Sequence, residues 1–176
     1  SVFLENVSVW TGSTMYRKEL LDRYNLRYTV GRTIAEDLEF EFKALFHAKL
    51  VSSFNESLSF YVQRPTSLTS TVDLLKRFQG MDALFDVRRY FVEWVSGDPS
   101  LELGGENDNP ASEVLLQREA LKYLETYMIP VSLAGVFGSV SKDGYPRDKL
   151  RDMLKSRSDF TAALRSFSPV PHANKA

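Results

Sequence analysis

Two adjacent carboxylates, Glu36 and Asp37, stand where the sequence changes from a turn to a helical pattern. The positive end of a helix dipole favours carboxylates in the first turn and keeps them ionised. An ionised carboxylate in a suitable place can act as a general base. The same acids can also serve only to stabilise the start of a helix. The residues alone leave both interpretations open.

The helix that presents this pair is predicted to run from Thr33 to about Lys49. Thr33 and Glu36 have the spacing of a capping box, in which Thr33 would be the N-cap. His47 falls near the apolar face of this helix, where a packed or surface histidine is more usual than a ligand. That face recurs at helical spacing and comprises Leu38, Phe42, Leu45 and Lys49, widened by Phe46.

The hydrophobic periodicity of the sequence changes near Ser70. Short apolar runs alternate with turns before it, and long helical periodicities dominate after it. The sequence therefore predicts an α+β fold dominated by helices, divided into residues 1–70 and 71–176. A small partial sheet is expected from residues 7–10, 51–54 and 58–63. A second copy of the chain could pair with the open edge of that sheet, which makes a homodimer one expectation.

The remaining periodic segments are predicted to be helices. Pro130 is expected to interrupt the helical pattern that begins at Val114, and Asp143-Gly144 is expected to be a turn. Residues 97–113 carry acids but no base and are predicted to be a loop. The expected helices cover residues 16–24, 70–95, 114–128, 131–140, 146–155 and 159–167.

Composition excludes several classes of site. The chain has no cysteine, which rules out disulfides, thiolate catalysis and cysteine-ligated zinc. The two histidines, His47 and His172, are too far apart in sequence to suggest a histidine-rich metal site. A formal net charge of -1 gives no global attraction to nucleic acid. The absence of cysteine fits a reducing compartment, so a cytoplasmic protein is expected.

Neither end of the sequence reads as a membrane-spanning or targeting segment. No run approaches the roughly 18 consecutive apolar residues of a membrane span, and the first residues contain Glu5 without a basic lead-in. Because no initiator Met is present, we expect the chain to be part of a longer protein. The segment from Ser141 to Ala176 contains eight basic and four acidic residues. That excess could contact the anionic inner face of the cell membrane or form a solvated helix face.

A longer pattern extends from Tyr16 to Thr69. Its parts are Tyr16-Arg17-x-Glu19-Leu20-Leu21, then Glu36-Asp37, Tyr61-x-x-Arg64 and Ser67-x-Thr69. In order and spacing, the pattern resembles the C-terminal half of the catalytic domain of bacterial family 2 glycosyltransferases, which are inverting enzymes of GT-A type. The resemblance covers less than half of the chain, and the rest would be a helical C-terminal extension.

The resemblance implies an enzyme of hexosyltransferase type. It would move a sugar, with inversion, from a nucleotide-sugar donor to a hydroxyl of a glycan or lipid-linked acceptor. Asp37 would be its general base. Arg64 would approach the donor diphosphate, although a solvated arginine at a strand end is equally consistent. Trp10 and Tyr16 could stack on an acceptor sugar or belong to the core. The substrate-binding candidates are therefore Glu36, Arg64, Ser67 and Trp10.

The chain departs from that family in one large respect. The nucleotide-binding half is absent, and no Asp-x-Asp occurs anywhere in the sequence. A divalent metal, Mg²⁺ or Mn²⁺, would be held mainly by the missing half, so no metal or cofactor is expected in this chain and it should be inactive alone. The alternative from another class is a non-enzymatic helical interaction module, in which Glu36-Asp37 only starts a helix.

Overall fold

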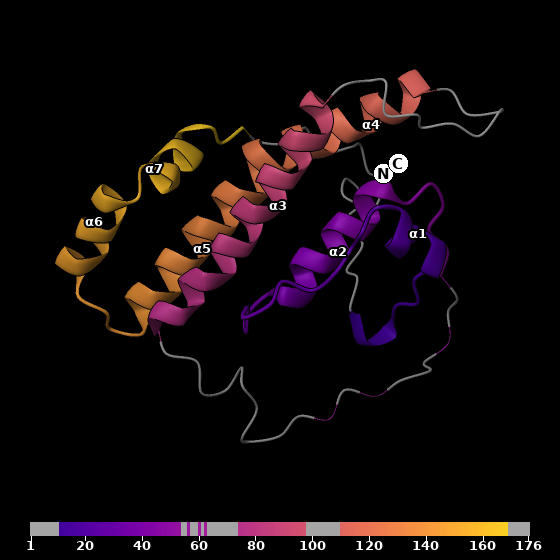
Figure 1. Ribbon diagram of the computed structural model, residues 1–176. Coiled ribbons are helices and arrows are strands. Elements are labelled where there is room, and N and C mark those ends of the chain that lie inside the picture. Colours follow the sequence, from indigo (N-terminus) through magenta and orange to yellow (C-terminus); the bar gives the residue numbers. More distant parts are fainter. Residues whose placement is uncertain are drawn as a thin grey trace. The chain divides into compact units, whose positions relative to one another are not determined.

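The computed structural model describes residues 11–53, 56, 60, 62, 74–97 and 110–168. The chain forms two compact units, Ser1–Phe91 and Val92–Ala176, and the boundary between them falls within helix α3 (Gln79–Ser96). All regular elements of the described residues are helical (Figure 1). The predicted division at residue 70 lies outside the described residues and stays a prediction.

The predicted partial sheet is wrong for the part of the chain that the structure describes, and the α+β fold class is wrong with it. Residues 51–53, Phe60 and Val62 belong to no strand. Val51, Phe60 and Val62 are all exposed, so their alternation does not mark one buried face of a sheet. Residues 7–10 and the rest of the two other predicted strands lie outside the described residues. The expected dominance of helices is confirmed.

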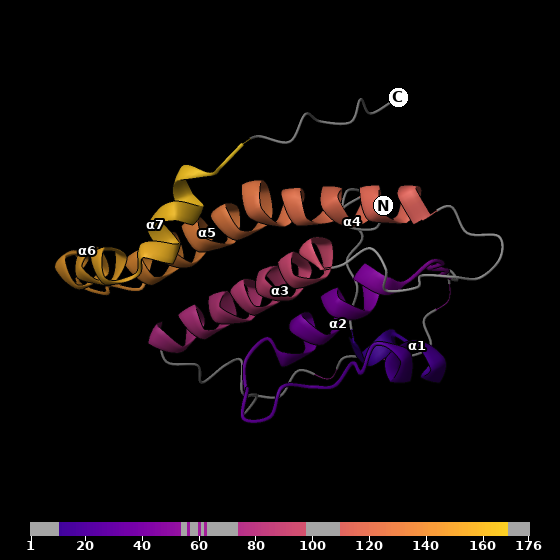
Figure 2. The same ribbon diagram turned by 45° about the horizontal axis from the view of Figure 1, so that its top comes forward.

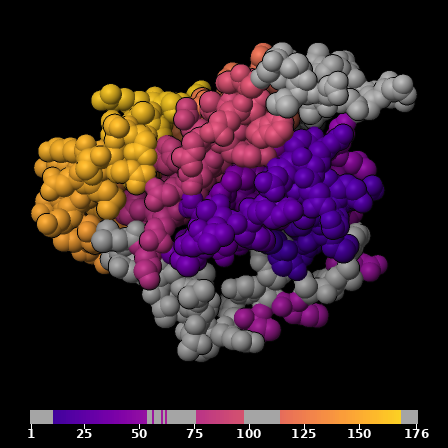
Figure 3. All heavy atoms as spheres, in the orientation of Figure 1, coloured from indigo at the N-terminus to yellow at the C-terminus, as the bar shows by residue number. Residues whose placement is uncertain are grey.

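The described part of unit 1 begins with two short helical pieces. These are η1 (Thr11–Ser13) and α1 (Lys18–Arg23), and the second confirms a shorter form of the helix predicted at 16–24. Helix α2 (Glu36–His47) follows, and η2 (Leu74–Phe78) leads directly into α3. Figure 3 shows the side chains of residues 11–47, from indigo to violet, as one continuous surface.

A left-handed residue ends α1 and turns the chain back toward the core. Asn25 has φ of 48°, a conformation that asparagine tolerates better than most residues. The Leu26 N–H donates to the Leu21 carbonyl at 2.8 Å, and the Asn25 N–H donates to the Asp22 carbonyl at 3.3 Å. This is the Schellman pattern. It places Leu26 in the core, where only 3% of its surface is exposed.

The core of unit 1 gathers around the middle of α2. Leu26, Phe40 and Ala44 form its centre. Near the C-terminal end of α2, the Phe46 ring stacks on Phe91 of α3 at 4.0 Å between centroids. Each such buried ring contributes about 1.5–3 kcal/mol through removal of apolar surface from water. Four partly buried side chains pack around the centre: Tyr16, Leu21, Tyr24 and Tyr90.

The inward face of α2 differs from the predicted one. Leu38, Phe42 and Leu45 are only partly buried, and Lys49 is exposed beyond the end of the helix. Of the predicted stripe, Phe46 alone is confirmed as buried. The buried residues of α2 are Glu39, Phe40, Glu41, Ala44, Phe46 and His47.

Unit 2 consists of helices from residue 110 to residue 165. Helices α4 (Pro110–Tyr123) and α5 (Ile129–Lys142) are joined by η3 (Leu124–Met128), a single π-helical turn. Figure 2 shows α4 and α5 following one another as one continuous helix. Helices α6 (Arg147–Ser156) and α7 (Ser158–Arg165) confirm the last two predicted helices, and the turn at Asp143-Gly144 is confirmed. None of the described helices has the length and apolar character that crossing a bilayer requires.

The core of unit 2 forms where α5 and α6 both pack against α7. Phe160 of α7 is fully buried. The ring of Phe137 meets it edge-to-face at 6.3 Å, and the Arg157 guanidinium lies 3.9 Å from its centroid. Arg157 also forms a 2.7 Å ion pair with Asp159. Apolar packing and a cation–π contact therefore fix α7 on its neighbours.

Pro130 does not interrupt the helix, contrary to the prediction. The Ile129 N–H donates to the Leu124 carbonyl, five residues back instead of four. Proline has no N–H, and in a regular α-helix its ring would clash with the carbonyl four residues earlier. The π-turn relieves that clash while the helix continues. It also leaves the carbonyls of Glu125 and Thr126 without their usual helical donors.

Two serines after the last helix donate to these carbonyls. The Ser166 hydroxyl donates to the Glu125 carbonyl at 2.8 Å. The Ser168 N–H donates to the Thr126 carbonyl at 2.8 Å. Phe167 lies between the two serines, and its ring stacks on Tyr127 at 6.2 Å. The missing donor of Pro130 thus creates an attachment point for the segment 166–168.

Replacement of Pro130 by alanine should weaken that attachment. The variant gains a backbone N–H that competes with Ser168 for the Thr126 carbonyl. We expect amide exchange of Ser168 to accelerate about fivefold, as loss of roughly 1 kcal/mol of hydrogen bonding would give. Amide hydrogen exchange followed by NMR measures this rate. Pro146→Ala, just before α6, is the control and should leave Ser168 unchanged. Equal rates in all three proteins would contradict this explanation of the π-turn.

Candidate functional site

The predicted acid pair lies at the start of α2. Glu36 is the first residue of the helix, and Ala35 is its N-cap, with φ 58° and ψ 26°. No side chain caps this end. The predicted capping box is therefore wrong, because the left-handed turn at Ala35 starts the helix too late for Thr33 to cap it. The Asp37 side chain is exposed, and its Oδ1 accepts the Leu38 N–H at 2.8 Å.

The left-handed backbone at Ala35 is unfavourable in itself. For a residue with a Cβ this conformation costs roughly 1–2 kcal/mol. Gly80 of α3 lies next to this turn, since a Cβ built there would be 3.9 Å from the Ala35 Cβ. Strained backbone of this kind persists only where the surrounding structure fixes it.

A buried ion-pair network fixes the loop before α2. Arg32 Nε lies 2.7 Å from Glu39 Oε2, and the same guanidinium pairs with Asp86 of α3. Lys43 Nζ lies 2.5 Å from Glu39 Oε1, and the Thr29 hydroxyl donates to that oxygen at 2.8 Å. Burial alone would raise the pKa of Glu39. The hydrogen bonds from Lys43 and Thr29, with the charges of Lys43 and Arg32, outweigh burial and lower that pKa.

Glu41 is a second buried acid on the same helix with the opposite behaviour. Only 6% of its surface is exposed, and the Tyr16 hydroxyl lies 3.5 Å from its Oε1. Burial and the charge of Asp37 raise the pKa of Glu41, although hydrogen bonds from Thr11 and Tyr16 oppose them. Burial and the charge of Glu41 in turn raise the pKa of Tyr16. Glu41 therefore holds its proton more tightly than an ordinary carboxyl.

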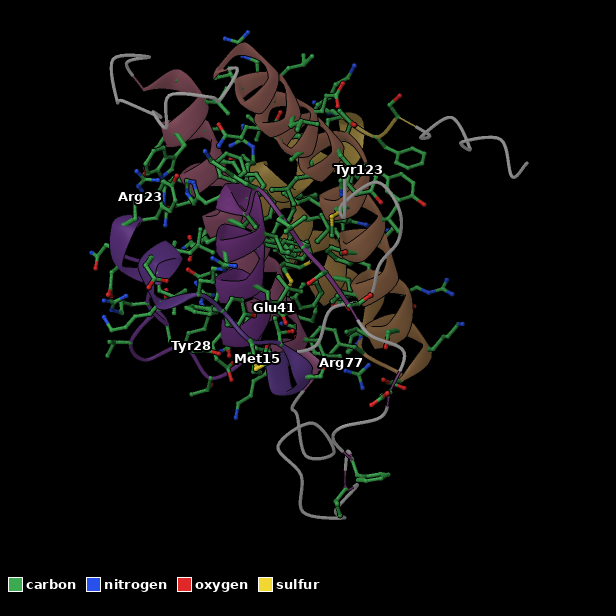
Figure 4. The ribbon with its side chains drawn as sticks, turned by 90° about the vertical axis from the view of Figure 1, so that its right-hand side faces the viewer. Met15, Arg23, Tyr28, Glu41, Arg77 and Tyr123 are labelled. Atoms are coloured by element: carbon green, nitrogen blue, oxygen red, sulfur yellow. The ribbon has the colours of Figure 1, made fainter. Side chains whose placement is uncertain are left out.

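Tyr28 brings an aromatic ring to these acids. Its ring stacks on Phe40 of α2, with 4.4 Å between centroids and 6° between planes. Burial, followed by the charges of Asp37, Glu41 and Glu36, raises the pKa of the Tyr28 hydroxyl. In Figure 4, Tyr28 and Glu41 lie on the same side of unit 1. The exposed carboxylate of Asp37 therefore lies about one helical turn before Phe40, the residue on which the half-exposed Tyr28 ring stacks.

His47 is a packed residue at the other end of α2. It is buried, and its ring stacks on Tyr24 at 3.7 Å between centroids. Its Nε2 lies 2.7 Å from the Tyr90 hydroxyl. Burial lowers the pKa of His47 to about 4, so the ring is neutral at physiological pH. Of the two usual positions that the sequence left open for His47, packed or at the surface, the structure shows the packed one.

The structure brings together only part of the predicted site. Glu36 and Asp37 are adjacent at the start of α2, while Arg64, Ser67 and Trp10 lie outside the described residues. Tyr16, for which stacking on a sugar and a core position were both open, packs edge-to-face on Phe40 at 5.1 Å.

Two neighbours of Asp37 were not predicted. Glu41 could have been found, because residues four apart share one face of a helix. Tyr28 carried no local signal, since its position depends on the left-handed residues Asn25 and Ala35. Within the described ranges, no three Asp, Glu or His side chains converge as metal ligands.

Comparison of the chain with protein-family models, with curated proteins and with solved structures gave no match. Inference about its function therefore depends on the residues and geometry described above.

Ala35→Gly should stabilise the protein. Glycine adopts the left-handed conformation without a steric penalty, which removes roughly 1–2 kcal/mol of strain, while its greater freedom when unfolded costs roughly 0.4–1 kcal/mol. We expect a net gain of about 0.5–1 kcal/mol in the free energy of unfolding, measured by urea denaturation. Ala44→Gly in the middle of α2 is the control and should lose about 1 kcal/mol or more. Destabilisation by both variants would show that Ala35 is not left-handed.

Glu41→Gln and Glu39→Gln should change stability in opposite directions at neutral pH. Because the folded-state pKa of Glu41 is raised, its contribution is complete below the ordinary carboxyl pKa and is lost as pH rises through the folded value. Glutamine stays neutral, so Glu41→Gln should be more stable than wild type near pH 7, and the difference should vanish toward about pH 4.

The pKa of Glu39 is lowered, so its stabilisation is present above the ordinary carboxyl pKa and is lost as pH falls through the folded value. Glu39→Gln should therefore be least stable, relative to wild type, at neutral pH. Urea denaturation at several pH values tests both variants. The assignment of the two environments would be refuted by a Glu41→Gln protein that is less stable than wild type at pH 7 yet equal to it near pH 4.

Proposed function

We propose that this chain supplies the acceptor side of an inverting glycosyltransferase, with Asp37 as the general base. The observation that carries the proposal is the placement of Asp37. Its carboxylate is exposed in the first turn of α2, three residues before Phe40, on whose ring the half-exposed Tyr28 stacks. The resemblance of the pattern from Tyr16 to Thr69 to family 2 glycosyltransferases adds to this support.

The proposed reaction is the attack of an acceptor hydroxyl on the anomeric carbon of a nucleotide-sugar. The bond from that carbon to the diphosphate oxygen breaks, and its electron pair leaves on the nucleoside diphosphate. Asp37 accepts the hydroxyl proton as the new glycosidic bond forms. The positive end of the α2 dipole favours the ionised carboxylate, which is the form that a base needs before the reaction.

The proposal assigns the donor site and its divalent metal to residues other than those described here. The partners would be a nucleotide-sugar and a glycan or lipid-linked acceptor. A cytoplasmic protein that touches the inner face of the membrane would suit a lipid-linked acceptor. Four exposed bases of α6 could meet the anionic lipid, although Asp148 and Asp152 interrupt them. These bases are Arg147, Lys149, Arg151 and Lys155. A homodimer is also part of the proposal. The sheet edge that first suggested it is not formed by the described residues.

A non-enzymatic helical interaction module is the second candidate. It is favoured by the purely helical character of the regular elements in the described residues. Under this alternative, Glu36 and Asp37 only complement the dipole of α2. The two candidates differ in what the loss of the Asp37 carboxylate does to turnover.

Asp37→Asn should abolish most of the turnover and leave the fold intact. Asparagine keeps the side-chain oxygen that accepts the Leu38 N–H, but it cannot take a proton from the acceptor. Loss of a positioned base typically lowers the rate roughly 10²–10⁴-fold. The measurement is nucleoside diphosphate release by the full-length gene product, with a panel of nucleotide-sugars and a membrane extract as acceptor. Thermal melts of the same proteins check the fold.

Glu36→Gln is the matched control one residue away. It removes a carboxylate from the same turn, so it should lose at most about 1 kcal/mol of stability. Glu36 is a candidate for substrate binding and not for proton transfer, so the variant should keep its kcat even where KM rises. If Asp37→Asn kept more than about a tenth of wild-type turnover, a smaller loss than a missing base gives, Asp37 would not be the base. Absence of donor-dependent release in the wild type would count against the enzyme and favour the helical module.

A further inference from the structure

The Tyr28 ring presents one open aromatic face. It is 47% exposed, although its ring lies almost parallel to Phe40 at 4.4 Å. Contact at that distance covers one face of the ring. The contact with Phe40 does not cover the opposite face of the ring. The open face of such a ring is apolar and can stack on the flat apolar face of a ligand.

The backbone on both sides of Tyr28 is anchored. Leu26 is buried in the core on one side. On the other side, the Thr29 hydroxyl donates to buried Glu39 at 2.8 Å. Between them, Arg27 Nη1 donates to the Leu26 carbonyl at 2.7 Å and to the Leu21 carbonyl at 3.2 Å. A ring held in this way loses little conformational freedom when a ligand stacks on it, so its contact favours binding fully.

The charges near the ring select the kind of ligand. Tyr28 stacks on Phe40, and Asp37 and Glu36 precede Phe40 by three and four residues, about one helical turn, on the same side of α2. Burial, followed by the charges of Asp37, Glu41 and Glu36, raises the pKa of the Tyr28 hydroxyl. A phosphate would compete with the carboxylates of Glu36 and Asp37, which already occupy the positive end of the α2 dipole. A neutral sugar suits both features, because its C–H face can lie on the ring while its hydroxyls donate to carboxylates.

We propose that Tyr28 is the stacking platform for a neutral sugar ring of the acceptor, beside Asp37. This inference rests on the proposed function and deepens it, since it names the side chain that binds the acceptor sugar. The platform takes the role that sequence analysis gave to Trp10 as a candidate. Tyr28 is a binding residue, and the proton transfer remains with Asp37.

The test uses the 176-residue chain and the methyl glycosides of common hexoses as probes. Saturation-transfer NMR with about 10 mM probe detects affinities in the millimolar range. Tyr28→Leu keeps an apolar side chain over Phe40 but removes the ring, and it should weaken binding about tenfold. Tyr28→Phe keeps the ring and should bind like wild type. Val30→Ala, at a fully exposed position of the same loop, is the control and should have no effect.

Binding that is equal in wild type and Tyr28→Leu would overturn the inference, as would the absence of binding of any hexoside by the wild type. Thermal melts show whether Tyr28→Leu is folded, and Tyr28→Phe supplies a second comparison if it is not. If Tyr28→Phe lost binding as well, the hydroxyl and not the ring face would be the contact, and the stacking proposal would be wrong. The effect of Asp37→Asn on turnover is a separate readout, so the proposed function can stand when this inference fails.

Discussion

The ion pair between Arg32 and Glu39 is the interaction on which unit 1 depends. Only 3% of the Glu39 side chain is exposed, and a carboxylate so deeply buried is tolerated only when it is paired and hydrogen-bonded. Arg32 pairs with Glu39 of α2 and also with Asp86 of α3. One guanidinium therefore joins the loop before α2 to two helices. Removal of one partner of such a buried pair typically costs about 3–5 kcal/mol, because the other charge is left alone.

This ion pair also explains why the inward face of α2 was predicted incorrectly. The apolar residues of α2 point to several sides of the helix. Their periodicity therefore predicts a helix but does not decide which side faces the core. The helix turns Glu39 inward toward Arg32, while Leu38 and Phe42 remain partly exposed. A pattern that counts acids as solvent-facing cannot anticipate this, since the arginine that neutralises the charge belongs to a loop. The existence of the helices was predictable from local spacing, but the facing of α2 depended on a non-local partner.

The same distinction separates the predicted part of the site from the part that was missed. Glu36 and Asp37 were found because a helix start has a local signature. The packing of Tyr28 on α2 depends on left-handed backbone at Asn25 and Ala35. Neither residue is a glycine, so the sequence gives no sign of these turns. In unit 2, Pro130 was read as a break because its missing N–H was considered alone. Ser166 and Ser168, which lie far away in sequence, donate to the Glu125 and Thr126 carbonyls of the π-turn.

The balance of energies links the network to the candidate site. A left-handed Ala35 costs roughly 1–2 kcal/mol, which is less than the roughly 3–5 kcal/mol at stake in a broken buried pair. The chain can therefore keep the strained turn as long as Arg32 holds the loop three residues earlier. That turn determines where α2 begins, and thus the exposure of Asp37. It also determines how the loop that contains Tyr28 joins the helix. The geometry of the site is accordingly determined by a guanidinium that makes its contacts with Glu39 and Asp86, away from the proposed reacting groups.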